Sequence, residues 1–383
     1  MSRRSRRHWG RPRRLPVSFA VVLYVVLAPP LLGCSPQRTV EAVGVLKEVA
    51  EISEPDPERE QPERRIVTFG MDGRRHEGDL YVLPEPEAGI IIVPGVAPAG
   101  RQDPRLVAFA GTLARANFEV LVPEVEGMRE ARVSATDARV FADAILYMAA
   151  RDRDRPLGIA GLSFALGPSV LALLEPGVEQ HTDFILAIGG YYDLEAAITY
   201  FTTGSYRLDP DEPWRHRALD GWGKWAFVSA NADRLEDRQD AELLRRIAER
   251  KIREPAADVS DLAERLGPEG RSVYALMVNE NPERVAELVE GLPTAVRDEI
   301  RALDLSRRPI ETLDVTFILI HGRDDPVIPF TQSVALAETL GPERAHLYLI
   351  DDLNHVDPEP PGLRDSIRMI QAVYRLLSIR DAR

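Results

Sequence analysis

One short stretch constrains the fold of this chain more than any other, because it predicts a strand, a sharp turn and a helix with a serine at the turn. The run 157–160 has the apolar composition of a buried strand, and residues 164–174 continue as an apolar helical pattern. Gly161, two positions before Ser163, lets the backbone pass close to the serine. Such a turn exposes the hydroxyl at the end of a sheet, with helical N–H groups beside it. A serine that caps an ordinary helix is the alternative interpretation.

Alternating strand and helix signals on both sides of this stretch predict an α/β fold. Besides 157–160, strands are expected at 66–69, 79–83, 89–95, 118–123, 184–188, 315–322 and 346–350. Helices are expected at 104–116, 136–150, 331–340 and 363–377. Continuous β-branched runs such as 90–93 are typical of strands buried on both faces. The pattern therefore predicts a mostly parallel central sheet flanked by helices.

The alternation is interrupted over 198–305, where amphipathic helical segments such as 240–252 and 282–292 occur without a strand signal. We expect an all-helical cap here, inserted between strands of a core formed by 66–197 and 306–383. Ligands bind at the carboxyl ends of the strands in such sheets, so the cap is expected to act as a lid and pocket wall.

Three aromatic residues lie where the strands before the cap end. Tyr191 and Tyr192 follow the strand 184–188, and Phe164 follows Ser163. They are candidates for the wall of a substrate pocket, with packing in the core as the alternative.

Two polar residues that follow later strands complete a possible nucleophilic site. Asp325 comes after the strand 315–322, and His355 after the next strand. A serine hydroxyl attacks efficiently only when a base takes its proton, and an imidazole base needs a carboxylate to orient it. Asp324 is an alternative acid. The Asp-x-x-hydrophobic-Pro spacing, typical of the acid in Ser-His-Asp sites, matches Asp325 to Pro329 and so favours Asp325. Asp193 is a third candidate and could instead cap a helix.

The chain order of serine, acid and histidine, each just after a strand, resembles the α/β-hydrolase family over about 66–195 and 306–380. The resemblance implies an α/β-hydrolase fold with Ser163 as nucleophile, Asp325 as acid and His355 as base. It also implies acyl transfer to water, and we expect a carboxylesterase. A peptidase, lipase or acyltransferase on the same triad is an alternative, as is a non-catalytic ligand-binding lipoprotein on this scaffold.

The family resemblance further implies an oxyanion hole made by the backbone N–H groups of Val96 and Phe164. Two positions depart from the family pattern. Pro94 stands where the family usually has histidine, and Ala165 stands where it usually has glycine. Neither change removes a catalytic group, because the N–H of residue 94 is not used and alanine is small.

The N-terminal residues have the pattern of an export signal. Residues 1–33 combine a basic start with a long apolar run, and Leu31-Leu32-Gly33-Cys34 resembles the lipobox of bacterial lipoproteins. The resemblance implies lipidation of Cys34 and an exported, membrane-anchored lipoprotein of the cell envelope. An uncleaved membrane span is the alternative. The Pro- and Glu-rich run 51–65 predicts a flexible tether over 34–65, and a short helix over about 40–50 is possible before that run.

Charge and composition exclude several classes of partner. The net charge is −13, and removal of residues 1–33, which hold seven arginines and no acid, takes it to −20. An acidic surface disfavours nucleic acid. No dinucleotide fingerprint follows a strand, and the carboxylates within 351–359 lack a second nearby histidine or cysteine, so we expect no cofactor and no metal. We interpret His321, at the end of a buried strand, as structural.

Overall fold

The computed structural model describes residues 35–50, 60–219, 221–351, 353–355, 357–358 and 362–382. At its centre is an eight-stranded sheet with the order β1-β2-β4-β3-β5-β6-β9-β10. The strands are β1 (Glu63–Phe69), β2 (His76–Val82), β3 (Ala88–Val93), β4 (Phe118–Pro123), β5 (Leu157–Leu162), β6 (Phe184–Ile188), β9 (Thr316–Gly322) and β10 (Ala345–Ile350). β2 pairs antiparallel with β1 and with β4, and all other neighbours in the sheet are parallel. The predicted mostly parallel sheet is confirmed.

Helices cover both faces of the sheet because alternate residues of each buried strand point to opposite sides. Ile91 and Leu319 belong to one apolar cluster, together with α5 (Ala138–Arg151), α6 (Leu166–Leu173) and α14 (Thr331–Leu340). Ile90 and Ile318 belong to the other, together with α2 (Pro36–Ala50), α3 (Pro104–Arg115) and α15 (Leu363–Arg380). The short helix α4 (Glu126–Arg129) follows β4. This strand order with helices on both faces is the α/β-hydrolase fold.

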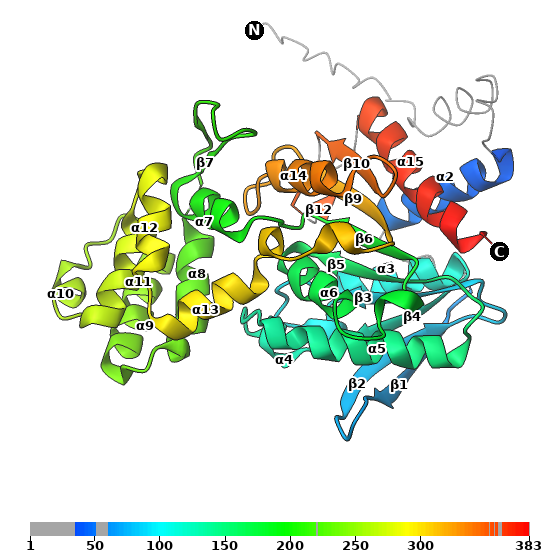
Figure 1. Cartoon of the computed structure of the whole chain (residues 1–383), viewed down its shortest axis with the longest axis horizontal. Coiled ribbons are helices and arrows are strands. Elements are labelled where there is room, and N and C mark those ends of the chain that lie inside the picture. Colours follow the sequence, from blue (N-terminus) through cyan, green and yellow to red (C-terminus); the bar gives the residue numbers. More distant parts are fainter. Residues whose placement is uncertain are drawn as a thin grey trace, which may run out of the picture.

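The chain leaves the sheet after β6 and returns at β9. Between them it forms α7 (Leu194–Thr203), α8 (Trp222–Asn231), α9 (Arg238–Arg253), α10 (Ser260–Ala263), α11 (Pro268–Val278), α12 (Val285–Glu290) and α13 (Thr294–Leu303). These helices enclose an apolar core of their own, in which Trp225 and Ile247 are buried. Helices α8 to α13 gather beside the sheet domain (Figure 1). We call α7 to α13 the cap.

The cap is not entirely helical, so the prediction was wrong in this detail. Ser205–Tyr206 (β7) and Arg215–His216 (β8) form a short antiparallel pair. Strands of two residues are too short to carry an alternating pattern, which is why the sequence shows no signal for them.

The helix α2 corrects the prediction of a tether over 34–65. Residues 36–50 pack against α15, and Ala42 and Val45 are buried in that contact. Arg380 of α15, only 5% exposed, forms an ion pair with Glu41. Residues 36–50 are therefore part of the folded domain (Figure 1).

The Pro- and Glu-rich residues 51–59, the predicted signal segment 1–33 and Cys34 lie outside the described residues. Within the ranges that the structure describes, no helix has the length and apolar character needed to cross a membrane.

Candidate active site

Ser163 lies at the turn that joins β5 to the helical segment continuing into α6. Its φ angle is +56°, in the left-handed region that residues other than glycine seldom adopt. The turn is crowded. A Cβ atom at Gly161 would lie 2.9 Å from Leu166 Cα, and one at Gly95 would lie 3.1 Å from Ser163 Cβ. The two glycines permit the strained turn that the sequence pattern predicts.

His355 reaches Ser163 from the loop that follows β10. Its Nε2 atom lies 2.8 Å from Ser163 Oγ, and its Nδ1 atom lies 2.6 Å from Asp325 Oδ2. A carboxylate accepts hydrogen bonds, so the proton is assigned to Nδ1, and Nε2 is left to accept the serine hydroxyl. The structure thus brings together the three side chains that the sequence selects from separate strand ends.

Asp325 is almost fully buried, with 1% of its surface exposed. Its Oδ1 atom accepts the N–H groups of Val327 (2.7 Å) and Ile328 (2.9 Å). Burial by itself raises the pKa of a carboxyl group. Hydrogen bonds from His321 and His355 outweigh this effect and hold the pKa of Asp325 well below its usual range. The carboxylate is therefore kept ionised and oriented toward His355.

The two predicted oxyanion-hole donors lie on the segments that flank Ser163. Phe164 follows the serine directly, and Val96 follows Gly95, whose close approach to Ser163 brings the loop after β3 against the turn. In the described ranges, neither the Val96 nor the Phe164 N–H donates a hydrogen bond to another protein group. The assignment of both groups to an oxyanion hole stays a prediction.

The two alternative acids have other partners. The exposed carboxylate of Asp324 forms an ion pair with Arg217, which lies just after β8 of the cap. Asp193 caps α7 by accepting the N–H of Ala196 at 2.9 Å. Neither of them contacts His355.

His321 takes part in the site in a way that the sequence analysis missed. This fully buried side chain has its Nε2 atom 3.0 Å from Ile328 O and 3.4 Å from Asp325 Oδ2, and its Nδ1 atom 2.7 Å from Ser333 Oγ. Ile328 O can only accept, so Nε2 carries the proton and Nδ1 accepts the Ser333 hydroxyl. The spacing of four residues between His321 and Asp325, across the end of a strand, is the sequence signal for this contact.

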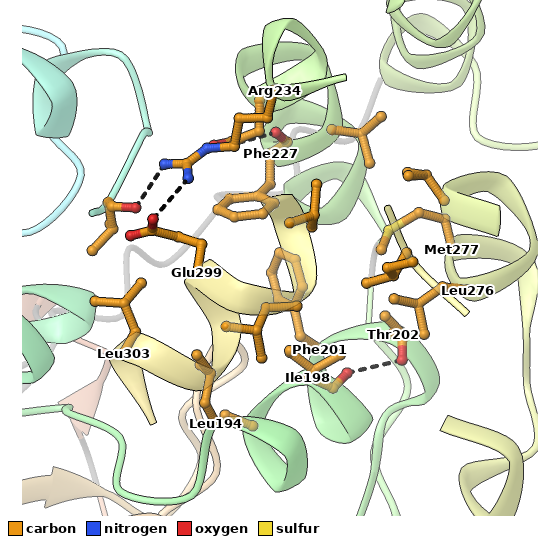
Figure 2. Close-up of a pocket in the computed structure, with 18 of the residues that line it drawn as sticks. Leu194, Ile198, Phe201, Thr202, Phe227, Arg234, Leu276, Met277, Glu299 and Leu303 are labelled. Carbon is orange, nitrogen blue, oxygen red and sulfur yellow. Dashed lines mark hydrogen bonds and ion pairs between the residues drawn. The ribbon is translucent and has the colours of Figure 1, made fainter. Parts of the chain in front are cut away.

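A cavity of about 160 Å³ lies between the sheet domain and the cap. Figure 2 shows its wall, to which α7, α8, α11 and α13 contribute. Tyr191 and Phe164 line it, whereas Tyr192 does not. The Tyr192 hydroxyl instead lies 3.1 Å from Thr339 Oγ1 on α14, so Tyr192 is not part of the wall of this cavity.

Asp351, one of the carboxylates considered for a metal site, is paired with basic side chains. It forms ion pairs with Arg323 at 3.1 Å and Arg368 at 3.6 Å. Asp352 and Glu359, from the same group, lie outside the described residues.

Comparisons with known proteins show similarity in structure alone. No protein-family model matches this sequence, and the comparison with curated proteins found no match. A Pyrococcus horikoshii acylaminoacyl peptidase is similar in structure, with a TM-score of 0.45 and 12% identity over 84% of this chain and 41% of that chain. A puromycin-hydrolyzing peptidase of Mycobacterium tuberculosis has a TM-score of 0.47 and 14% identity over 83% of this chain and 39% of that one.

A third similar structure is a meta-cleavage product hydrolase from Pseudomonas fluorescens, with a TM-score of 0.41 and 17% identity over 82% of this chain and 96% of that chain. The present chain spans about two fifths of the length of the two peptidases. The fold itself is defined by the strand order. The protein therefore has the α/β-hydrolase fold. In its candidate site, His355 is hydrogen-bonded to Ser163 on one side and to Asp325 on the other.

Proposed function

We propose that this protein is a serine hydrolase that cleaves carboxylic esters through an acyl-enzyme intermediate. One observation carries the proposal: Ser163 Oγ lies 2.8 Å from His355 Nε2, while His355 Nδ1 lies 2.6 Å from the buried carboxylate of Asp325. A base within hydrogen-bond reach of a hydroxyl, itself oriented by a third group, is the arrangement that activates a serine.

In the proposed reaction, Ser163 Oγ attacks the ester carbonyl carbon while His355 Nε2 takes the hydroxyl proton. The oxyanion that forms accepts the N–H groups of Val96 and Phe164, and Asp325 stabilises the imidazolium. The tetrahedral species collapses, the C–O bond to the alcohol breaks, and His355 returns the proton to the leaving alcohol. A water molecule then attacks the acyl-serine, with His355 again accepting a proton and passing it to Ser163 Oγ.

Labelling with a fluorophosphonate probe tests whether Ser163 is activated. We expect the wild-type protein to be labelled, and the Ser163→Ala and His355→Ala variants to lose labelling. Ser366→Ala is the matched control, because Ser366 is a partly exposed serine on α15 that is not one of the three site residues. A folded wild-type protein that is not labelled would contradict the proposal.

The choice between esterase, peptidase and acyltransferase needs a second measurement. Ester and amide substrates with the same acyl group should be compared, with and without an added acceptor alcohol. We expect the ester to be cleaved faster and water to remain the main acceptor. Faster cleavage of the amide would favour a peptidase, and transfer to the alcohol would favour an acyltransferase.

We also propose that Cys34 carries the lipid anchor. The proposal is supported by the sequence of residues 31–34 and by the position of α2, which begins at Pro36. Because α2 packs on α15, such an anchor would hold the domain close to the membrane surface. Mass spectrometry of the exported protein should find a diacylglyceryl group on Cys34, and Cys34→Ser should release the protein from the membrane fraction. Retention of the Cys34→Ser protein in that fraction would contradict the anchor.

A further inference from the structure

The residue next to the proposed nucleophile lines the cavity between the sheet domain and the cap. Phe164, whose N–H is a proposed oxyanion donor, also contributes its ring to the wall. Its ring centroid lies 5.9 Å from that of Tyr191 and 6.5 Å from that of Phe201, which in turn lies 6.1 Å from Phe227. These rings form a continuous aromatic series from Phe164 to Phe227 on α8. Figure 2 shows Phe201 and Phe227 on the wall of the cavity.

Most of the wall is aliphatic or aromatic, and the polar side chains on it are bound to other protein groups. Arg234 donates to Val133 O at 2.8 Å and to Asn231 Oδ1 at 2.9 Å. Glu299 accepts the N–H of Ala135 at 2.6 Å. The hydroxyl of Thr202, also on the wall, donates to a carbonyl oxygen of its own helix at 2.8 Å. A polar group that entered the cavity would lose its hydrogen bonds to water and find few protein partners to replace them, which costs free energy. A hydrocarbon group has no such bonds to lose, and its transfer out of water is favourable.

The volume limits the size of that hydrocarbon group. A dry cavity of about 150 Å³ lined by leucine, isoleucine and phenylalanine accommodates one benzene molecule. The present cavity, at about 160 Å³, has similar size and composition. It therefore suits a chain or ring of about six carbons.

We propose that this cavity binds the hydrocarbon group of the substrate and sets an upper limit of about six carbons on the group that is bound well. The inference rests on the proposed hydrolysis at Ser163 and adds a substrate class to it, namely esters that carry a medium-length alkyl or a phenyl group.

Two series of esters test the proposal. In one the acyl chain is lengthened from two to twelve carbons with 4-nitrophenol as the alcohol, and in the other the alcohol is lengthened with acetate as the acyl group. In one series kcat/KM should rise about fourfold for each added methylene up to about six carbons and then fall. The series that shows this maximum identifies the part of the ester that enters the cavity.

The possible outcomes separate the two proposals. Ser163-dependent hydrolysis with no dependence on chain length in either series would overturn the cavity assignment and leave the hydrolase proposal intact. A rise that continues to twelve carbons would also overturn it. Failure of both hydrolysis and fluorophosphonate labelling would overturn the hydrolase proposal itself.

A matched pair of variants on α11 localises the effect. Val273 lines the cavity, whereas Val278 of the same helix is 45% exposed and does not. Val273→Phe should move the maximum to shorter chains, and Val278→Phe should leave it in place. If Val273→Phe lowers the melting temperature too far for assay, Phe227→Ala serves instead, because Phe227 is 37% exposed and its removal should move the maximum to longer chains. An unchanged maximum in a folded Val273→Phe or Phe227→Ala protein would contradict the proposal.

Discussion

His321 Nε2 lies 3.4 Å from Asp325 Oδ2, the same carboxylate oxygen that faces His355 Nδ1 at 2.6 Å. One oxygen of the proposed catalytic acid is therefore placed between two imidazoles, while the other accepts two backbone N–H groups. The carbonyl oxygen of Ile328 only accepts, so the N–H of His321 faces Ile328 O and the carboxylate, while Nδ1 accepts the hydroxyl of Ser333. His321 does not touch the reacting atoms and is a positioning residue.

Replacing His321 should lower activity by weakening the orientation of Asp325. We expect His321→Phe to reduce kcat/KM about tenfold, because a hydrogen bond to a charged group contributes roughly 1.5 kcal/mol. His321→Gln should lose less, since its amide can still donate. A lower melting temperature with unchanged kinetics would assign His321 a structural role only.

Asp325 and Asp324 form a natural pair of test and control. We expect Asp325→Asn to lower kcat by roughly 10⁴-fold, the loss typical of an Asp-to-Asn change in a Ser-His-Asp triad. Asp324→Asn should change kcat less than about threefold, because exposed charge pairs contribute little and this one is with Arg217, away from His355. Steady-state kinetics on one ester measure both. A larger loss of kcat in Asp324→Asn than in Asp325→Asn would identify Asp324 as the acid.

The site residues that the structure brings together carry local signals in the sequence. The strands β3, β5 and β9 are buried on both faces and therefore appear as continuous apolar runs in the sequence. Ser163 and Asp325 directly follow such runs within short motifs, so their positions at the sheet edge could be inferred from the order of residues alone.

The features that were missed depend on contacts between distant segments. Nothing near Tyr192 indicates that its hydroxyl meets Thr339, and nothing near Asp324 indicates Arg217. The helix α2 has apolar residues at helical spacing, yet the surface that covers them is on α15, more than 300 residues later in the chain. The sequence therefore allowed a short helix within the tether but did not indicate that this helix packs on the folded domain.

Substitutions in α2 test whether this helix is part of the folded domain. A Cβ atom at Gly44 would meet nothing within 4 Å, so Gly44→Ala should stabilise the protein by about 0.5–1 kcal/mol through helix propensity. Ala42 is fully buried, and Ala42→Asp should destabilise it by about 2 kcal/mol or more. Denaturant unfolding of the protein measures both changes. If α2 were a free tether, neither substitution would alter the midpoint.

Asp137 makes the stability of the protein depend on pH near the boundary between the sheet domain and the cap. Its Oδ2 atom accepts the N–H of Ser134 at 2.9 Å, and Glu299 of α13 lies nearby. Burial is the main reason that the pKa of Asp137 is raised from 3.8 to about 6. The negative charge of Glu299 contributes to this rise, and the hydrogen bond from Ser134 opposes it in part. The folded protein therefore holds this proton more tightly than the unfolded chain does. The resulting stabilisation is fully present below about pH 3.8 and is lost as the pH rises through about 6.

The variant Asp137→Asn should remove this contribution, since a neutral amide keeps the acceptor oxygen without the buried charge. At pH 7.5 we expect its free energy of unfolding to exceed that of the wild type by on the order of 2 kcal/mol, and the difference to shrink toward pH 4. Urea unfolding at several pH values measures it, with Asp72→Asn, at an exposed carboxylate, as the control. Curves for Asp137→Asn and wild type that run parallel from pH 4 to 7.5 would show that Asp137 is ionised throughout this range in the folded protein.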